Sequence, residues 1–245
     1  MLQILTMKNQ KPIVLLAALI LPAFGLSNVR ADIIYNDDIT AIFGSGNPNG
    51  GFTAATTADG DGSLLTLAER FKDRPSGSTT NTDGVYTDPL GGLANLEFSI
   101  DTGSLALDAF TYTLAIDTNP TSADTFVTID PTTYYSDNSY GTDATGNGGG
   151  TTGLYSAFGG TDSLLQNSEK LSFAPSGISF ATNGTYDAVL SAYNSDGRLV
   201  DQVTTQIVIG SGGATVPDTA ATAALLGLGL AALVLARRKL AGANC

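Results

Sequence analysis

The chain has 245 residues with no histidine, no tryptophan and one cysteine, and its formal net charge is −12. Without an imidazole, Ser-His-Asp and Cys-His catalysis are excluded, and zinc sites lack their usual ligands. Carboxylate chemistry and hard-cation binding through oxygen are the chemistries left open. The acidity separately excludes a nucleic-acid-binding protein.

Residues 1–31 have the pattern of a secretory signal peptide. Two lysines precede an apolar run over 12–25, and a Val-Arg-Ala sequence ending at Ala31 places small residues at both contact positions of a cleavage site. We therefore predict cleavage after Ala31 and a mature N-terminus at Asp32. An uncleaved anchor is the alternative.

The part of the chain that would remain after export is strongly acidic. Between residues 32 and 217, five basic residues stand against twenty-two acidic ones, a net charge of −17. Such a surface repels nucleic acids and anionic lipids and keeps an exported protein soluble. Cys245, the only cysteine, is the last residue, so the exported body would fold without a disulfide, which its length allows.

The first half of this body alternates short apolar runs with turn residues. One strand is predicted over 32–43 and another over 63–71, where good helix formers leave a short helix as the alternative. Residues 73–92 predict a long loop or a weak edge hairpin. Residues 93–101 and 109–117 show the period-two alternation of half-buried strands.

The second half contains the clearest hairpin. After a strand over 125–129, residues 136–153 are rich in glycine and lose periodicity, which is typical of a functional or mobile connection. Residues 185–193 and 199–209 alternate around a four-residue turn. For residues 32–210 we therefore predict one all-β domain, an antiparallel β-sandwich with a jelly-roll arrangement favoured over a barrel.

Carboxylates are the first candidate ligands. Asp59 and Asp61 alternate with glycines as at the start of a Ca²⁺ loop, but the twelfth position of an EF-hand loop would be Arg70 instead of Glu, so an ordinary acidic turn is the alternative. Glu97 and Asp101, at i and i+4 of one strand, could form the carboxylate pair of a glycosidase. Because an acidic chain offers many such pairs by chance, we expect no enzyme, and calcium is the one cofactor considered.

Aromatic side chains are the second candidates. Tyr134, Tyr135 and Tyr140 gather around the glycine-rich loop. Exposed rings there would stack on the faces of sugars, and packing in the core or loop is the alternative. This pattern keeps a carbohydrate- or calcium-binding module open as the second function.

The C-terminal region has three parts behind a glycine-rich linker over 211–215. The first is a tetrapeptide, Val216, Pro217, Asp218 and Thr219. An uncharged run follows over 220–236, which as a helix would measure roughly 25 Å, near the lower limit for a membrane span. The third part is a basic triplet, Arg237, Arg238 and Lys239, which holds its end of a membrane helix and the tail over 240–245 in the cytoplasm.

The order of these three parts resembles the PEP-CTERM sorting signals of Gram-negative bacteria, in the VPDSG-type variant, with Thr219 and Ala220 where that pattern has Ser and Gly. The resemblance implies recognition by an exosortase, an intramembrane cysteine transpeptidase, and release from the tether or transfer to the cell surface. Residues 90–210 also look like a recurrent class of PEP-CTERM surface proteins. We therefore expect an exported structural or adhesive protein of the cell envelope or the exopolysaccharide matrix, anchored in the membrane only transiently.

Overall fold

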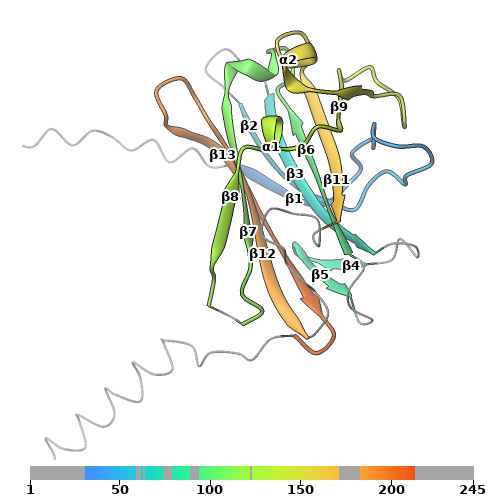
Figure 1. Cartoon of the computed structure of the whole chain (residues 1–245), viewed down its shortest axis with the longest axis vertical. Helices are drawn as coiled ribbons and strands as arrows, with labels where there is room; N and C mark the ends of the chain where they lie inside the picture. Colours follow the sequence, from blue (N-terminus) through green and yellow to red (C-terminus); the bar gives the residue numbers. More distant parts are fainter. Residues whose placement is uncertain are drawn as a thin grey trace, which may run out of the picture.

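The computed structural model describes residues 31–58, 62, 64–73, 79–88, 94–121, 123–170 and 183–212. These residues form two β-sheets packed face to face (Figure 1), which confirms the predicted all-β class. The predicted signal peptide before Ala31 and the whole C-terminal sorting region lie outside the described residues.

One sheet has seven strands. In spatial order they are β1 (Asp32–Asp37), β2 (Phe52–Ala58), β3 (Leu64–Asp73), β6 (Ala94–Asp101), β11 (Leu164–Lys170), β9 (Asn138–Gly141) and β10 (Thr151–Gly153). All neighbours in this sheet run antiparallel.

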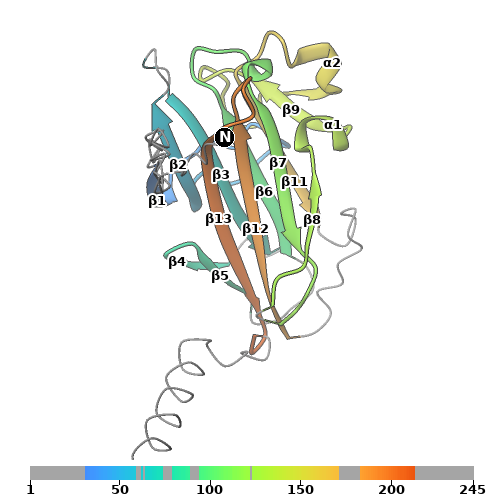
Figure 2. The same ribbon diagram turned by 90° about the vertical axis from the view of Figure 1, so that its left-hand side faces the viewer.

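The other sheet has six strands, and Figure 2 shows it lying across the front of the first. Its spatial order is β4 (Thr80–Thr82), β5 (Val85–Asp88), β13 (Leu199–Ile209), β12 (Gly184–Tyr193), β7 (Thr111–Asp117) and β8 (Phe126–Ile129). Three short helices connect strands: η1 (Leu107–Ala109), α1 (Pro131–Tyr134) and α2 (Tyr155–Phe158).

The core fills the space between the sheets because alternate side chains of each strand point inward. Phe98 and Leu67 of the first sheet and Leu190 and Ile207 of the second are inaccessible to solvent. The predicted hairpin is confirmed as β12 and β13, paired from Gly184 opposite Ile209 to Tyr193 opposite Leu199.

The strand order differs from the jelly-roll expectation in two respects. The chain contributes a β1–β2–β3 meander to one sheet, and the structure has more strands than the eight that make up the two Greek keys of a jelly roll. In addition, β13 pairs with β5 in parallel, so the six-stranded sheet is mixed instead of purely antiparallel. The predicted loop or weak hairpin over 73–92 contains β4 and β5, of which only β4 is an edge strand.

The prediction of one strand over 32–43 is wrong beyond Asp37. Residues 38–51 instead form a strap, the blue loop in Figure 1, which packs on the outer face of the seven-stranded sheet. The strap's apolar residues, Ala41 to Phe43, are buried there. The Gln166 side chain fixes the strap by accepting from Ile42 N at 2.8 Å and donating to Thr40 O at 3.0 Å.

The strap also explains why β6 is not half-buried as predicted. Asn95, Glu97 and Ser99 point to the covered outer face and are at most 2% exposed. The glycine-rich segment 136–153 contributes to the same cover, because Gly148 N and Gly150 N donate to Ala41 O and Ile42 O. A segment expected to be irregular thus contains β9 and β10 and helps to seal the sheet.

Candidate functional site

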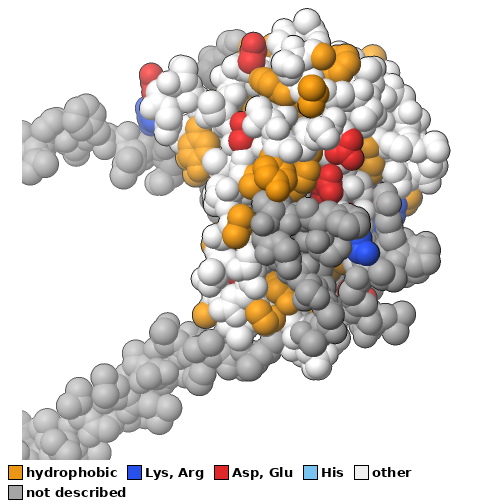
Figure 3. Space-filling view, viewed as in Figure 1, with side chains coloured by type: hydrophobic (Ala, Val, Ile, Leu, Met, Phe, Trp, Pro, Cys, Tyr) orange, Lys and Arg blue, Asp and Glu red, His pale blue; other side chains and the backbone are white. Residues whose placement is uncertain are grey.

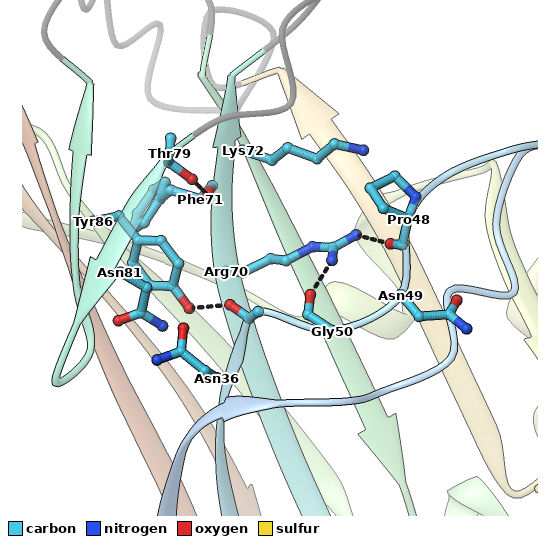
Figure 4. A pocket seen from close by; sticks show the side chains of 11 residues that line it. Asn36, Pro48, Asn49, Gly50, Arg70, Phe71, Lys72, Thr79, Asn81 and Tyr86 are labelled. Atoms are coloured by element: carbon cyan, nitrogen blue, oxygen red, sulfur yellow. Dashed lines mark hydrogen bonds between the residues drawn. The ribbon is translucent and has the colours of Figure 1, made fainter.

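A polar pocket of about 220 Å³ lies between the strap, the end of β3 and the β4–β5 hairpin (Figure 4). Its wall is formed by amides, two cations, backbone carbonyls and two aromatic rings. The polar side chains that matter most are Asn36, Asn49, Arg70, Lys72, Asn81 and Tyr86.

Arg70 forms one side of the pocket and is 4% exposed. Its Nε lies 2.5 Å from Glu97 Oε2, directly across the pairing of β3 with β6. Its terminal nitrogens donate to Pro48 O, at 3.0 Å, and to Gly50 O, both in the strap. The guanidinium also lies 4.2 Å from the centroid of the Phe52 ring, within the range of a cation–π contact. Arg70 therefore ties the strap to the sheet.

Lys72, two positions further along β3, shares the same carboxylate. Its Nζ lies 3.2 Å from Asn47 Oδ1 and 4.0 Å from Glu97 Oε1. Two cations and one fully buried carboxylate are thus grouped under the strap, where each side chain is held by protein oxygens or nitrogens.

Tyr86 of β5 forms the opposite side. Its hydroxyl donates to Gly51 O at 2.9 Å and lies 3.1 Å from Glu69 O. Burial, the largest cause, raises the pKa of Tyr86 to about 12, so the phenol keeps its proton at neutral pH. Asn81 beside it is fixed by accepting a hydrogen bond from Gly84 N at 3.0 Å.

Asn36 completes the pocket from the edge strand β1. Its φ is +59°, in the left-handed region that non-glycine residues rarely adopt. It lies where the pairing of β1 with β2 shifts register, between Ile34 and Asp37. Such irregularities re-aim a side chain, and in Figure 4 the Asn36 amide lies on the same side of the pocket as that of Asn81.

The three predicted tyrosines are not grouped in one exposed site. Tyr135 and Tyr140 are 6% and 1% exposed and belong to the core, the packing alternative, because a buried ring cannot stack on a sugar. The Tyr140 ring stacks on Phe158 with centroids 5.2 Å apart. Tyr134 is 48% exposed and contacts Tyr135 edge-on, so a ligand contact stays a prediction for Tyr134 alone.

The two carboxylates considered for a glycosidase do not face one another as a pair. Glu97 is fully buried against Arg70, whereas Asp101 hydrogen-bonds with Asp143, and burial together with Asp143 raises the pKa of Asp101 to about 6. Asp59 and Asp61 lie outside the described residues. Among the residues that the structure describes, no three acidic, histidine or cysteine side chains are grouped to hold a metal ion.

The predicted sorting residues, Val216, Pro217, Asp218, Thr219, Arg237, Arg238 and Lys239, lie outside the described residues, as does the predicted membrane span. None of the helices in the described part of the chain is long and apolar enough to cross a membrane. Ala31 is the first described residue, and its side chain packs against the core.

Comparison with known proteins decides the nature of this end of the chain. Residues 215–240 match the family VPDSG-CTERM, described as the VPDSG-CTERM motif. The C-terminus is a VPDSG-CTERM sorting signal. The VPDSG-CTERM signal is a variant of the PEP-CTERM type, which confirms the resemblance of the three-part tail, and it indicates an exported protein that a sorting system processes. A search of the curated proteins found no match for the chain.

Proposed function

We propose that this protein is an exported surface or extracellular-matrix protein of structural or adhesive type, which an exosortase sorts and processes through its VPDSG-CTERM signal. The match over residues 215–240 carries the proposal. The acidic composition of the body supports it, since a net charge of −17 between residues 32 and 217 suits a soluble extracellular domain. On the face in Figure 3 the described side chains include both acidic and apolar groups among mostly uncharged polar surface.

Deletion of the sorting signal tests the proposal. Without Val216–Cys245 the protein loses both the tether and the sequence that the processing enzyme reads, so we expect the body in the medium with an unprocessed C-terminus. Cell fractionation and intact mass measure both. Deletion of residues 241–245 alone, beyond the matched signal at 215–240, is the matched control and should leave sorting unchanged. If the protein without Val216–Cys245 were still retained by the cell and processed normally, the proposal would be contradicted.

A second candidate function is a carbohydrate- or calcium-binding module. The polar pocket favours the carbohydrate form, because amide side chains and carbonyls line it. The calcium form rests on the sequence pattern of Asp59 and Asp61.

Calcium binding has a direct thermal test. A cation that binds the folded protein and not the unfolded chain raises the melting temperature, and the rise grows with the logarithm of its concentration above Kd. If Asp59 and Asp61 bind Ca²⁺, we expect a higher melting temperature in millimolar Ca²⁺ than in EDTA, and the difference should vanish in the Asp59→Asn, Asp61→Asn variant. Equal melting temperatures in both solutions would remove the calcium form.

A further inference from the structure

The pocket under the strap presents neutral polar groups to its interior, while its cations are bound to the protein. Arg70 donates to Glu97, Pro48 O and Gly50 O, and Lys72 is held by Asn47 and Glu97. The two cationic side chains are therefore part of the wall of the pocket. Glu97 is the carboxylate that pairs with both of them.

Amide groups supply the remaining polar chemistry. Asn36, Asn49 and Asn81 line the space, and each amide both donates and accepts hydrogen bonds. Sugar hydroxyls have the same double character. A carboxylate or phosphate ligand would accept only, and the donors that would suit it, Arg70 and Lys72, are already bonded to Glu97, to Asn47 and to carbonyl groups of the strap.

Asn36 is an exposed member of the lining, so its amide is open both to water and to a ligand. Among the described residues its amide has no hydrogen-bond partner, whereas Asn49 accepts from Ala41 N and Asn81 accepts from Gly84 N. Its left-handed backbone, which Asn adopts more readily than most residues, lies in a register shift of an edge strand, and such a shift re-aims the side chain.

The volume limits the size of the ligand. At about 220 Å³ the pocket is smaller than the roughly 300–1,000 Å³ of sites that enclose drug-sized molecules. One sugar ring fits this size. We propose that this pocket binds one neutral sugar ring of a polysaccharide. The proposal rests on the carbohydrate form of the second candidate function and names its site and ligand class.

Binding of free sugars to the intact chain tests the proposal. The protein is kept in a detergent without a sugar head group, and glucose, galactose, mannose, N-acetylglucosamine and glucuronate are titrated by calorimetry and saturation-transfer NMR. We expect saturable, millimolar binding of at least one neutral sugar and weaker binding of glucuronate. No saturable binding of any neutral sugar, or tighter binding of glucuronate, would overturn the proposal.

Asn36→Gly locates the binding. Glycine adopts positive φ without strain, so this variant removes the amide and keeps the backbone, and loss of one or two hydrogen bonds predicts affinity reduced roughly three- to tenfold. Asp83→Gly is the matched control, because Asp83 is the other described non-glycine residue with positive φ, at 51°, and does not line the pocket. If Asn36→Gly bound the sugar with the affinity of the wild type, the pocket would not be the binding site.

The outcomes separate this proposal from the functions on which it rests. Equal retention of wild type and Asn36→Gly on a polysaccharide column would place carbohydrate binding elsewhere on the protein and remove the pocket. Sorting and processing are read at the C-terminus, so Asn36→Gly should leave both unchanged.

Discussion

Replacing Glu97 by glutamine is expected to lower the free energy of unfolding by about 3–5 kcal/mol, because two buried cations lose their common carboxylate. Glu97 is fully buried, Arg70 Nε lies 2.5 Å from it, and Lys72 Nζ lies 4.0 Å away. The two cationic side chains are only 5% and 11% exposed, so water can replace the carboxylate only in part. The strap should loosen as well, since Arg70 also holds its carbonyl groups. The midpoint of urea unfolding measures the loss.

Two further variants define the contribution of the ion pair. Glu169→Gln, on the neighbouring strand β11, removes the same charge from a half-buried side chain and should change stability by no more than about 1 kcal/mol. Arg70→Met combined with Glu97→Gln should recover part of the loss, because replacing both partners removes most of the uncompensated charge. An unchanged urea midpoint for Glu97→Gln would show that the cations do not depend on this carboxylate.

The stability of the protein should fall as the pH rises from 4.5 to 8, and Glu69→Gln should remove the part of that fall above pH 6 and reduce the part below it. Glu69 lies between the sheets with no exposed surface, and Thr205 Oγ1 donates to its Oε2 at 3.1 Å. Among the described residues its Oε1 has no hydrogen-bond partner. Burial, partly opposed by the Thr205 hydrogen bond, raises the pKa of Glu69 from 4.5 to about 8.

The sign follows from proton binding. Between the two pKa values the folded protein keeps a proton that the unfolded chain has released, so stability is fully present below pH 4.5 and is lost as the pH rises to about 8. At about 1.4 kcal/mol per pKa unit, the loss is on the order of 4 kcal/mol. Urea midpoints at pH 4.5, 6 and 8 measure it, and glutamine, which does not titrate, should remove the difference between pH 6 and 8.

Asp201→Asn separates Glu69 from another buried carboxyl group with a raised pKa. Burial raises the pKa of Asp201 from 3.8 to about 6, so this variant should reduce the slope below pH 6 and leave the slope between 6 and 8 intact. Parallel pH curves for wild type and Glu69→Gln would show that Glu69 is ionised in the folded protein at neutral pH.

The sequence predicts well those elements in which the pattern of apolar and polar residues matches the buried and exposed positions. In β12 and β13, inward and outward positions alternate along the whole hairpin, and the pattern agrees with the register. In β6 the same alternation is misleading, because the strap that covers its outer face comes from residues 38–51, distant in sequence. The strand β11 escaped prediction because Gln166, Asn167 and Ser168 are polar although all three contribute to its pairing with β6.

The candidate pocket could not be predicted either, because its residues come from segments that are distant in sequence. Arg70 in the sequence appears only as the residue that breaks an EF-hand pattern, and Glu97 appears as part of an exposed polar face. The pairing of β3 with β6 places them directly opposite each other. The one signal available beforehand was the position of two cations, Arg70 and Lys72, on the same side of one strand in a chain with few bases. The sorting signal, by contrast, needs no tertiary contacts to be recognised, since its order of parts is contiguous.

The position of β13 affects how the molecule bears mechanical load. This strand is the last described element before the C-terminal signal, and it is hydrogen-bonded on both sides, to β12 along its length and to β5 in parallel. A pull in line with β13 would load the flanking hydrogen bonds together in shear instead of breaking them one after another. A domain tethered by an edge strand would peel open under far less tension.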